Sequence, residues 1–96
     1  KKTLELEPKN AAAIYNCGLI LYGLEKPAEA IPYFEQSLQI TPGDADILEM
    51  VGLCYLRSEK YKEALDSFKK AKTHAKDAEK QKRLDELIAE TSKMVK

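Results

Sequence analysis

The sequence predicts an all-α protein built from antiparallel helix pairs, with a closing helix at its C-terminal end. Residues 11–44 align with residues 45–78 without a gap, which defines a repeat of 34 residues, and periods of about 20–50 residues are typical of helical solenoids. Apolar residues recur at helical spacing within each unit. Only four Gly and four Pro interrupt the 96 residues, so the elements between them are long.

Eight positions of the two units are identical, and half of them hold Gly, Ala or Phe. Gly and Ala leave space between helices and Phe fills it, so these matches indicate a shared packing geometry. The identical pairs are Ala11/Ala45, Gly18/Gly52, Leu19/Leu53, Glu25/Glu59, Lys26/Lys60, Glu29/Glu63, Ala30/Ala64 and Phe34/Phe68.

Two apolar stripes predict two helices in the first unit. Pro27 lies between the stripes and suits the first turn of the second helix, where its missing N–H costs nothing. Residues 41–44 contain Pro and Gly, which end the second helix, and Asp44 is a natural N-cap for the next one. The stripes consist of Ile14, Cys17, Leu21 and Leu24 in the first helix and of Ala30, Ile31, Phe34 and Leu38 in the second.

The second unit repeats this plan, and a glycine lies inside the first helix of both units. Gly18 and Gly52 each cost up to ~1 kcal/mol relative to Ala in a helix, so their recurrence predicts a close approach of two helices. We expect Ala30 and Ala64 to face the glycines, with the two Phe side chains in the wider space beyond. The stripes of this unit are Leu48, Val51, Tyr55 and Leu56, then Tyr61, Ala64, Leu65 and Phe68.

These residues resemble the tetratricopeptide repeat, whose pattern is W-x2-L-G-x2-Y…A-x3-F…P over 34 residues. The large positions match by class, Trp is absent, and Lys76 stands where the second unit should have Pro. The resemblance implies an α–α superhelix, the solenoid of antiparallel helix pairs that this family forms. The matching residues are Ile14-x2-Cys17-Gly18-x2-Leu21…Ala30-x3-Phe34…Pro42 and Leu48-x2-Val51-Gly52-x2-Tyr55…Ala64-x3-Phe68.

Both ends of the chain extend this organisation. Residues 1–10 resemble the end of a preceding repeat, since Pro8 lies 34 residues before Pro42, and the chain opens without Met. We therefore expect a fragment of a longer protein of this family. Residues 79–96 lose the 34-residue phase and predict a capping helix with one polar face, which arrays need at their ends. Its apolar stripe is Leu84, Leu87, Ile88, Thr91 and Val95.

The composition argues against several functions. Sixteen basic and sixteen acidic residues leave no net charge, whereas nucleic-acid binding usually needs a basic face. No apolar run approaches the ~20 residues that span a bilayer. One histidine, His74, offers no nucleophile–base arrangement, and Cys17 and Cys54 lack metal-ligand spacing. We expect no enzymatic activity, no cofactor and no metal, and the few cysteines permit a cytoplasmic location.

Binding of a protein partner is the predicted function, as a scaffold or adaptor module. The resemblance implies that the first helix of each pair lines a concave groove, which would hold an extended peptide or a helix. The acidic pair in the second unit favours a neutral or basic partner segment. The predicted groove residues are Tyr15, Asn16, Leu19, Tyr22, Asp46, Glu49, Met50, Leu53 and Arg57, with Ala12 and Gly23 beside them.

Two alternatives remain at this stage. The repeats could instead space or dimerise a larger protein, as a homodimer through the exposed apolar face. That face could also be covered, either by a preceding repeat or by the closing helix. Some family members grip the terminal carboxylate of chaperone tails, but only Asn16 and Lys80 match that set, since Met50 and Leu84 occupy the other positions. Chaperone-tail binding is therefore disfavoured.

Overall fold

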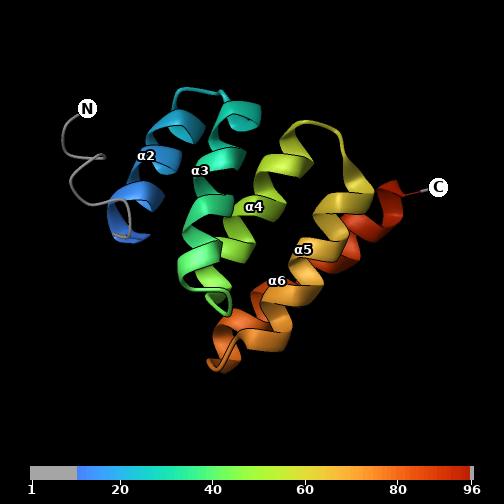
Figure 1. Cartoon of the computed structure of the whole chain (residues 1–96). Helices are drawn as coiled ribbons and strands as arrows, with labels where there is room; N and C mark the ends of the chain where they lie inside the picture. The colour runs from blue at the N-terminus through green and yellow to red at the C-terminus, as the bar shows by residue number, and fades with distance from the viewer. Residues whose placement is uncertain (1–10, 96) are drawn as a thin grey trace.

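The helices alternate in direction along the chain, joined by short turns (Figure 1). The computed structural model describes residues 11–95. The predicted remnant of a preceding repeat, residues 1–10, lies outside this range. The described part of the chain contains no strand and consists of α2 (Ala11–Gly23), α3 (Pro27–Ile40), α4 (Ala45–Arg57), α5 (Tyr61–His74) and α6 (Ala78–Met94).

Each helix packs on the one that follows it, so the chain zigzags between two layers. The first layer holds α2, α4 and α6, and the second holds α3 and α5. In Figure 1, α2 and α6 lie at opposite ends of the array. The prediction of an all-α array of antiparallel helix pairs with a closing helix is confirmed.

Aspartates begin α4 and α6. Asp44 Oδ1 accepts hydrogen bonds from the backbone N–H groups of Asp46, at 3.0 Å, and Ile47, at 3.3 Å, as the sequence predicted for this N-cap. Asp77 Oδ1 accepts from the backbone N–H of Glu79 at 3.1 Å. Each cap satisfies N–H groups that have no partner within the helix, and its negative charge is favourable at a helix N-terminus.

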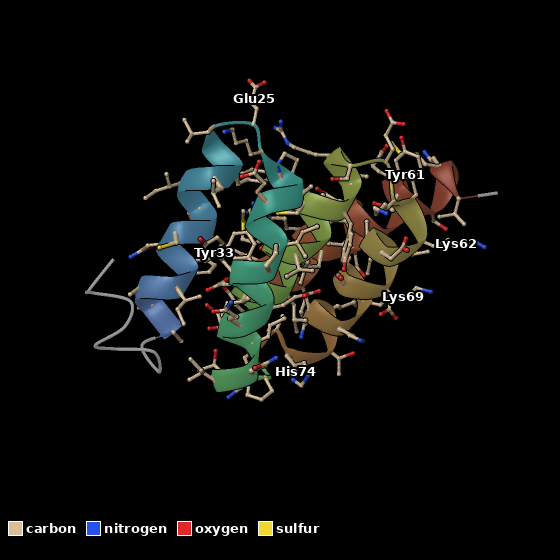
Figure 2. The ribbon with its side chains drawn as sticks, turned by 45° about the horizontal axis from the view of Figure 1, so that its top comes forward. Glu25, Tyr33, Tyr61, Lys62, Lys69 and His74 are labelled. Atoms are coloured by element: carbon tan, nitrogen blue, oxygen red, sulfur yellow. The ribbon has the colours of Figure 1, made fainter. Side chains whose placement is uncertain are left out.

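The two pairs also share the turn between their helices. Glu25 and Glu59 adopt left-handed backbone conformations, with φ of 63° and 65°. The N–H of the following lysine then reaches back to a carbonyl of the first helix, from Lys26 to Leu21 at 2.9 Å. This is the Schellman arrangement, in which orphan carbonyls at a helix end are satisfied. Figure 2 shows Glu25 projecting from this turn, away from the helices.

A phenylalanine ring lies against the glycine inside each helix pair. A Cβ on Gly18 would come within 2.7 Å of Cε1 of Phe34, and one on Gly52 within 2.5 Å of Cε1 of Phe68. Both rings are fully buried. The expectation that the alanines face the glycines, with the rings beyond, is therefore wrong: the ring itself occupies the space that the absent side chain leaves.

The closing helix α6 packs on α5 much as α4 packs on α3. The N-cap of α4, Asp44, precedes the first residue of the buried stripe, Ile47, by three residues. The N-cap of α6, Asp77, precedes its counterpart Leu84 by seven. The N-terminal part of α6 is therefore longer by four residues, or about one turn. This offset explains why the 34-residue phase is lost. The stripe Leu84, Ile88 and Thr91 repeats the spacing of Ile47, Val51 and Cys54, 37 residues later.

The other side of α6 differs from that of α4. In α4, Leu48, Gly52 and Tyr55 contact the next helix, α5. The corresponding residues of α6 are Asp85, Ala89 and Ser92, all of them exposed. This polar side can face water, as the end of an array requires.

We expect Gly52→Ala to lower the free energy of unfolding by about 1–3 kcal/mol, because the added methyl group collides with a buried ring. Thermal and urea unfolding would measure this. Gly23→Ala is the control, because nothing lies within 4 Å of a Cβ at Gly23; it should be neutral or stabilising by up to about 1 kcal/mol. Equal effects of the two substitutions would contradict the ring-on-glycine contact.

Candidate functional site

The predicted groove residues lie on α2 and α4. The surface of the α2–α4–α6 layer that points away from α3 and α5 is called the inner face below. The apolar groove residues are half-buried rather than fully solvated. Most of them pack beside the cluster around Phe34 and Val51, and Leu53 packs beside the cluster around Phe68. The core therefore holds these side chains in place while part of each remains accessible. They are Tyr15, Leu19, Tyr22, Met50 and Leu53.

One polar contact joins α2 and α4 across the inner face. The Nε of Arg57 donates a hydrogen bond to the hydroxyl of Tyr22 at 2.9 Å. The guanidinium also lies 5.0 Å from the centroid of the Tyr22 ring, within the range of a cation–π interaction. Asn16 is exposed on the same helix as Tyr22.

A cleft of about 310 Å3 lies at the other end of the inner face, where α2 and α4 begin. Tyr15 forms part of its lining with Asp44 and Asp46. The pKa of Tyr15 is raised, first by burial and then by the negative charges of Asp46 and Asp44. The Tyr15 ring also packs against the ring of Phe34 in a tilted arrangement, with the two centroids 5.5 Å apart. This contact holds the Tyr15 ring in place.

The acidic pair expected to attract a partner is already bound by cations of α6. Glu49 is 4% exposed. Its Oε1 accepts from Lys80 Nζ at 2.9 Å, while its Oε2 lies 2.9 Å from Nε of Arg83 in an ion pair without an aligned hydrogen bond. Lys80 also pairs with Asp46. The expectation that this acidic pair attracts a neutral or basic partner segment is thus corrected, because Lys80 and Arg83 of α6 already pair with it.

The protonation of Lys80 reflects these contacts. Burial by itself lowers the pKa of Lys80, but hydrogen bonds and charges from Asp46 and Glu49 outweigh burial and raise the pKa. Because a raised lysine pKa means a stabilised cation, the charge on Lys80 contributes to folding below the ordinary lysine value while Asp46 and Glu49 are ionised. That contribution is lost as the pH rises through the higher folded-state pKa of Lys80.

Burial makes the thiol of Cys54 a poor nucleophile. Cys54 is fully buried, and burial raises the pKa of its thiol to about 12, so the nucleophilic thiolate is absent near neutral pH. His74 is the last residue of α5 and is exposed. Across residues 11–95, no group of three His, Cys, Asp or Glu could hold a metal ion.

None of the helices in the described range is both long and apolar enough to cross a membrane.

Comparison with known families identifies these repeats. A model of the family described as "Tetratricopeptide repeat" matches residues 10–77, which is most of the chain. The chain belongs to the tetratricopeptide repeat family. Because these repeats are a protein-interaction fold, the chain is a protein-interaction repeat module.

A solved structure described as "MamA RS-1 ArsTM double mutant" has a similar fold, with a TM-score of 0.72 and 20% sequence identity. The alignment covers 96% of this chain and 61% of that one. Among curated protein sequences, none matches this chain. The structural likeness confirms the superhelical arrangement of tetratricopeptide helices.

Sequence reasoning missed the ion-pair network between α6 and α4, although one signal was present. Lys80 lies in the first turn of α6, where the helix dipole disfavours positive charge. A negative partner on another helix would offset this effect. Because residues 79–96 do not follow the 34-residue repeat, the tetratricopeptide pattern does not show which residues of α6 lie beside which residues of α4. The partners of Lys80 and Arg83 on α4 could therefore not be assigned from the sequence.

We expect Lys80→Met to lower the free energy of unfolding by about 1–2 kcal/mol, because Glu49 then keeps only Arg83 as a partner while still buried. Lys70→Met is the matched control: Lys70 pairs with Asp66 at 3.2 Å with both side chains more than 60% exposed. Such a pair contributes about 0.5 kcal/mol or less. If chemical denaturation gave equal losses, the α4–α6 network would be no stronger than a solvated pair.

Proposed function

We propose that the chain binds an extended peptide or a helix of a partner protein along its inner face, as a scaffold or adaptor module. The observation that carries the proposal is the row of half-buried Tyr, Leu and Met side chains on α2 and α4. Tyr, Met and Arg are enriched at protein interfaces. The contacting residues we propose are Tyr15, Asn16, Leu19, Tyr22, Asp46, Met50, Leu53 and Arg57.

Rigidity supports this proposal. Tyr15 is stacked on Phe34, and Tyr22 is held by Arg57, so both rings lose little conformational freedom when a partner binds. Preorganised side chains of this kind increase affinity because less entropy is lost on association. Glu49, by contrast, contributes by holding α6 in place and not by touching the partner.

The proposed units are two repeats, residues 11–44 and 45–78, with residues 1–10 as the end of a preceding repeat and residues 79–96 as the closing helix. Under this division the inner face of the chain consists of two first helices bordered by α6. A partner segment would therefore run across α2 and α4 and end near Lys80 and Arg83.

Peptides selected from a random library against the 96-residue chain would test the proposal. We expect Met50→Ala to weaken binding of the selected peptide by about tenfold, which corresponds to an interface residue that costs more than 1 kcal/mol when truncated. Titration calorimetry would measure the affinity, and amide NMR shifts would locate the peptide.

Met94→Ala is the matched control, because Met94 is 44% exposed at the far end of α6. It should leave the affinity unchanged. Circular dichroism would verify that both variants keep their helix content. Normal binding by the Met50 variant, with peptide shifts confined to α3 and α5, would contradict an inner-face site.

A second candidate function, a structural joint or dimerisation element, rests on a different surface. Ile20 on α2 and Leu24 in the turn after it are 63% and 61% exposed, at the N-terminal end of the described helices. Cys54, the counterpart of Ile20 one repeat later, is fully buried against α3. We propose that this side of α2 packs against a neighbouring repeat or a second copy of the chain.

Sedimentation equilibrium would test this second function. We expect weak self-association, since one short helix side is small compared with the roughly 800 Å2 per partner of a stable interface. Ile20→Lys should abolish it, whereas Ile40→Lys, at a 37% exposed position on α3, should not. A strictly monomeric chain at every concentration would rule out the homodimer.

A further inference from the structure

A second cleft lies on the opposite layer, between α3 and α5. It has a volume of about 210 Å3. Its floor is apolar, because Leu48, Val51 and the ring of Tyr55 on α4 contribute to it together with Leu38 on α3. Leu48 and Val51 belong to the core and are 7% and 4% exposed, so the cleft reaches down to the interior of the repeat.

Carboxylates surround this apolar floor. Glu35 lies on α3, and Glu63 and Asp66 lie on α5. Asp66 is paired with Lys70, the single cation of the lining. Within residues 11–95, neither Glu35 nor Glu63 has a cationic partner within 4 Å. The rim therefore carries two negative charges that no cation of the described residues neutralises.

Both of these charges act on the hydroxyl of Tyr55. Its hydroxyl donates to Oε2 of Glu35 at 3.3 Å. The pKa of Tyr55 is raised by burial first, then by the charge of Glu35 and the hydrogen bond to it, and also by Glu63. The two glutamates thus act on one point of the cleft even though they belong to different repeats.

A hydroxyl also faces the cleft. Ser67 on α5 lines it, and the residue as a whole is 7% exposed. Its hydroxyl is not among the buried side-chain atoms without a partner, so solvent or a ligand group can reach it from the cleft. This hydroxyl can accept a hydrogen bond beside the two unpaired carboxylates.

We propose that this cleft binds one arginine side chain from a protein partner. The aliphatic stem would lie on the apolar floor, and the guanidinium would reach the carboxylates of Glu35 and Glu63. A guanidinium suits the site better than an ammonium, since it is planar, carries five donors and is more weakly hydrated. Its bonds to carboxylates are charge-assisted and directional, and Ser67 supplies a further acceptor.

This site is separate from the inner face. Its rim belongs to the second helices of two successive repeats, so a partner can occupy it while the inner face is filled or empty. The inner face differs in charge, because Asp46 and Glu49 are paired with Lys80. An arginine side chain therefore finds unpaired carboxylates at the α3–α5 cleft and neutralised ones on α4.

The test uses the 96-residue chain and the peptide acetyl-Ala-Ala-Arg-Ala-Ala-amide. Its matched control contains citrulline in place of arginine, which keeps the shape and removes the charge. We expect saturable amide NMR shifts at Leu38, Tyr55 and Ser67 with the arginine peptide and none with the citrulline peptide. Added salt should weaken the binding, because the rim charges are partly exposed.

Variants of the rim complete the test. Glu35→Gln and Glu63→Gln should each weaken binding by about two- to fivefold, as expected for exposed charge pairs, and Ser67→Ala should weaken it as well. Glu29→Gln, an exposed carboxylate on α3 outside the cleft, should have no effect, and thermal melts would verify folding. Equal shifts with citrulline, an equal loss in the Glu29 variant, or shifts on α2 and α4 alone would overturn the proposal.

Discussion

In each repeat a phenylalanine ring rests directly on a glycine of the neighbouring helix, and this contact sets the distance between the two helices of a pair. Phe34 on Gly18 and Phe68 on Gly52 are the same contact made twice, 34 residues apart. Because the interior is close-packed, neither ring can move without opening a cavity. The two pairs therefore share one geometry, and equivalent side chains occupy equivalent places on the surfaces that the pairs create.

The two ends of the array differ in how they meet solvent. At the C-terminal end, α6 turns a polar side outward and binds back to α4 through Lys80 and Arg83. At the other end of the described residues, Ile20 on α2 and Leu24 in the turn after it are exposed. A repeat cannot bury its own apolar sides completely, and stability comes from each neighbour covering the next. Within residues 11–95, α6 provides such a cover for α5.

The two layers also differ in chemistry. The inner face combines half-buried aromatic and aliphatic side chains with acidic groups that α6 already neutralises. The opposite layer places unpaired glutamates, from two different repeats, around a small apolar floor. One of these glutamates belongs to the repeat and the other does not: Glu63 matches Glu29 of the first repeat, whereas Glu35 stands where the second repeat has Lys69. The cleft therefore combines a shared position with one at which the two repeats differ in charge.

The sequence by itself determined the helix pairs, their register and the N-cap at Asp44, because these depend on local spacing and on contacts repeated at a fixed period. It also placed Tyr22, Met50 and Leu53 on one layer. Only the tertiary structure decided that Phe34 and Phe68 fill the space at the glycines and that α6 starts one turn early. It alone revealed that Glu49 is buried and paired, since that pairing joins residues more than 30 positions apart through a helix outside the repeat phase.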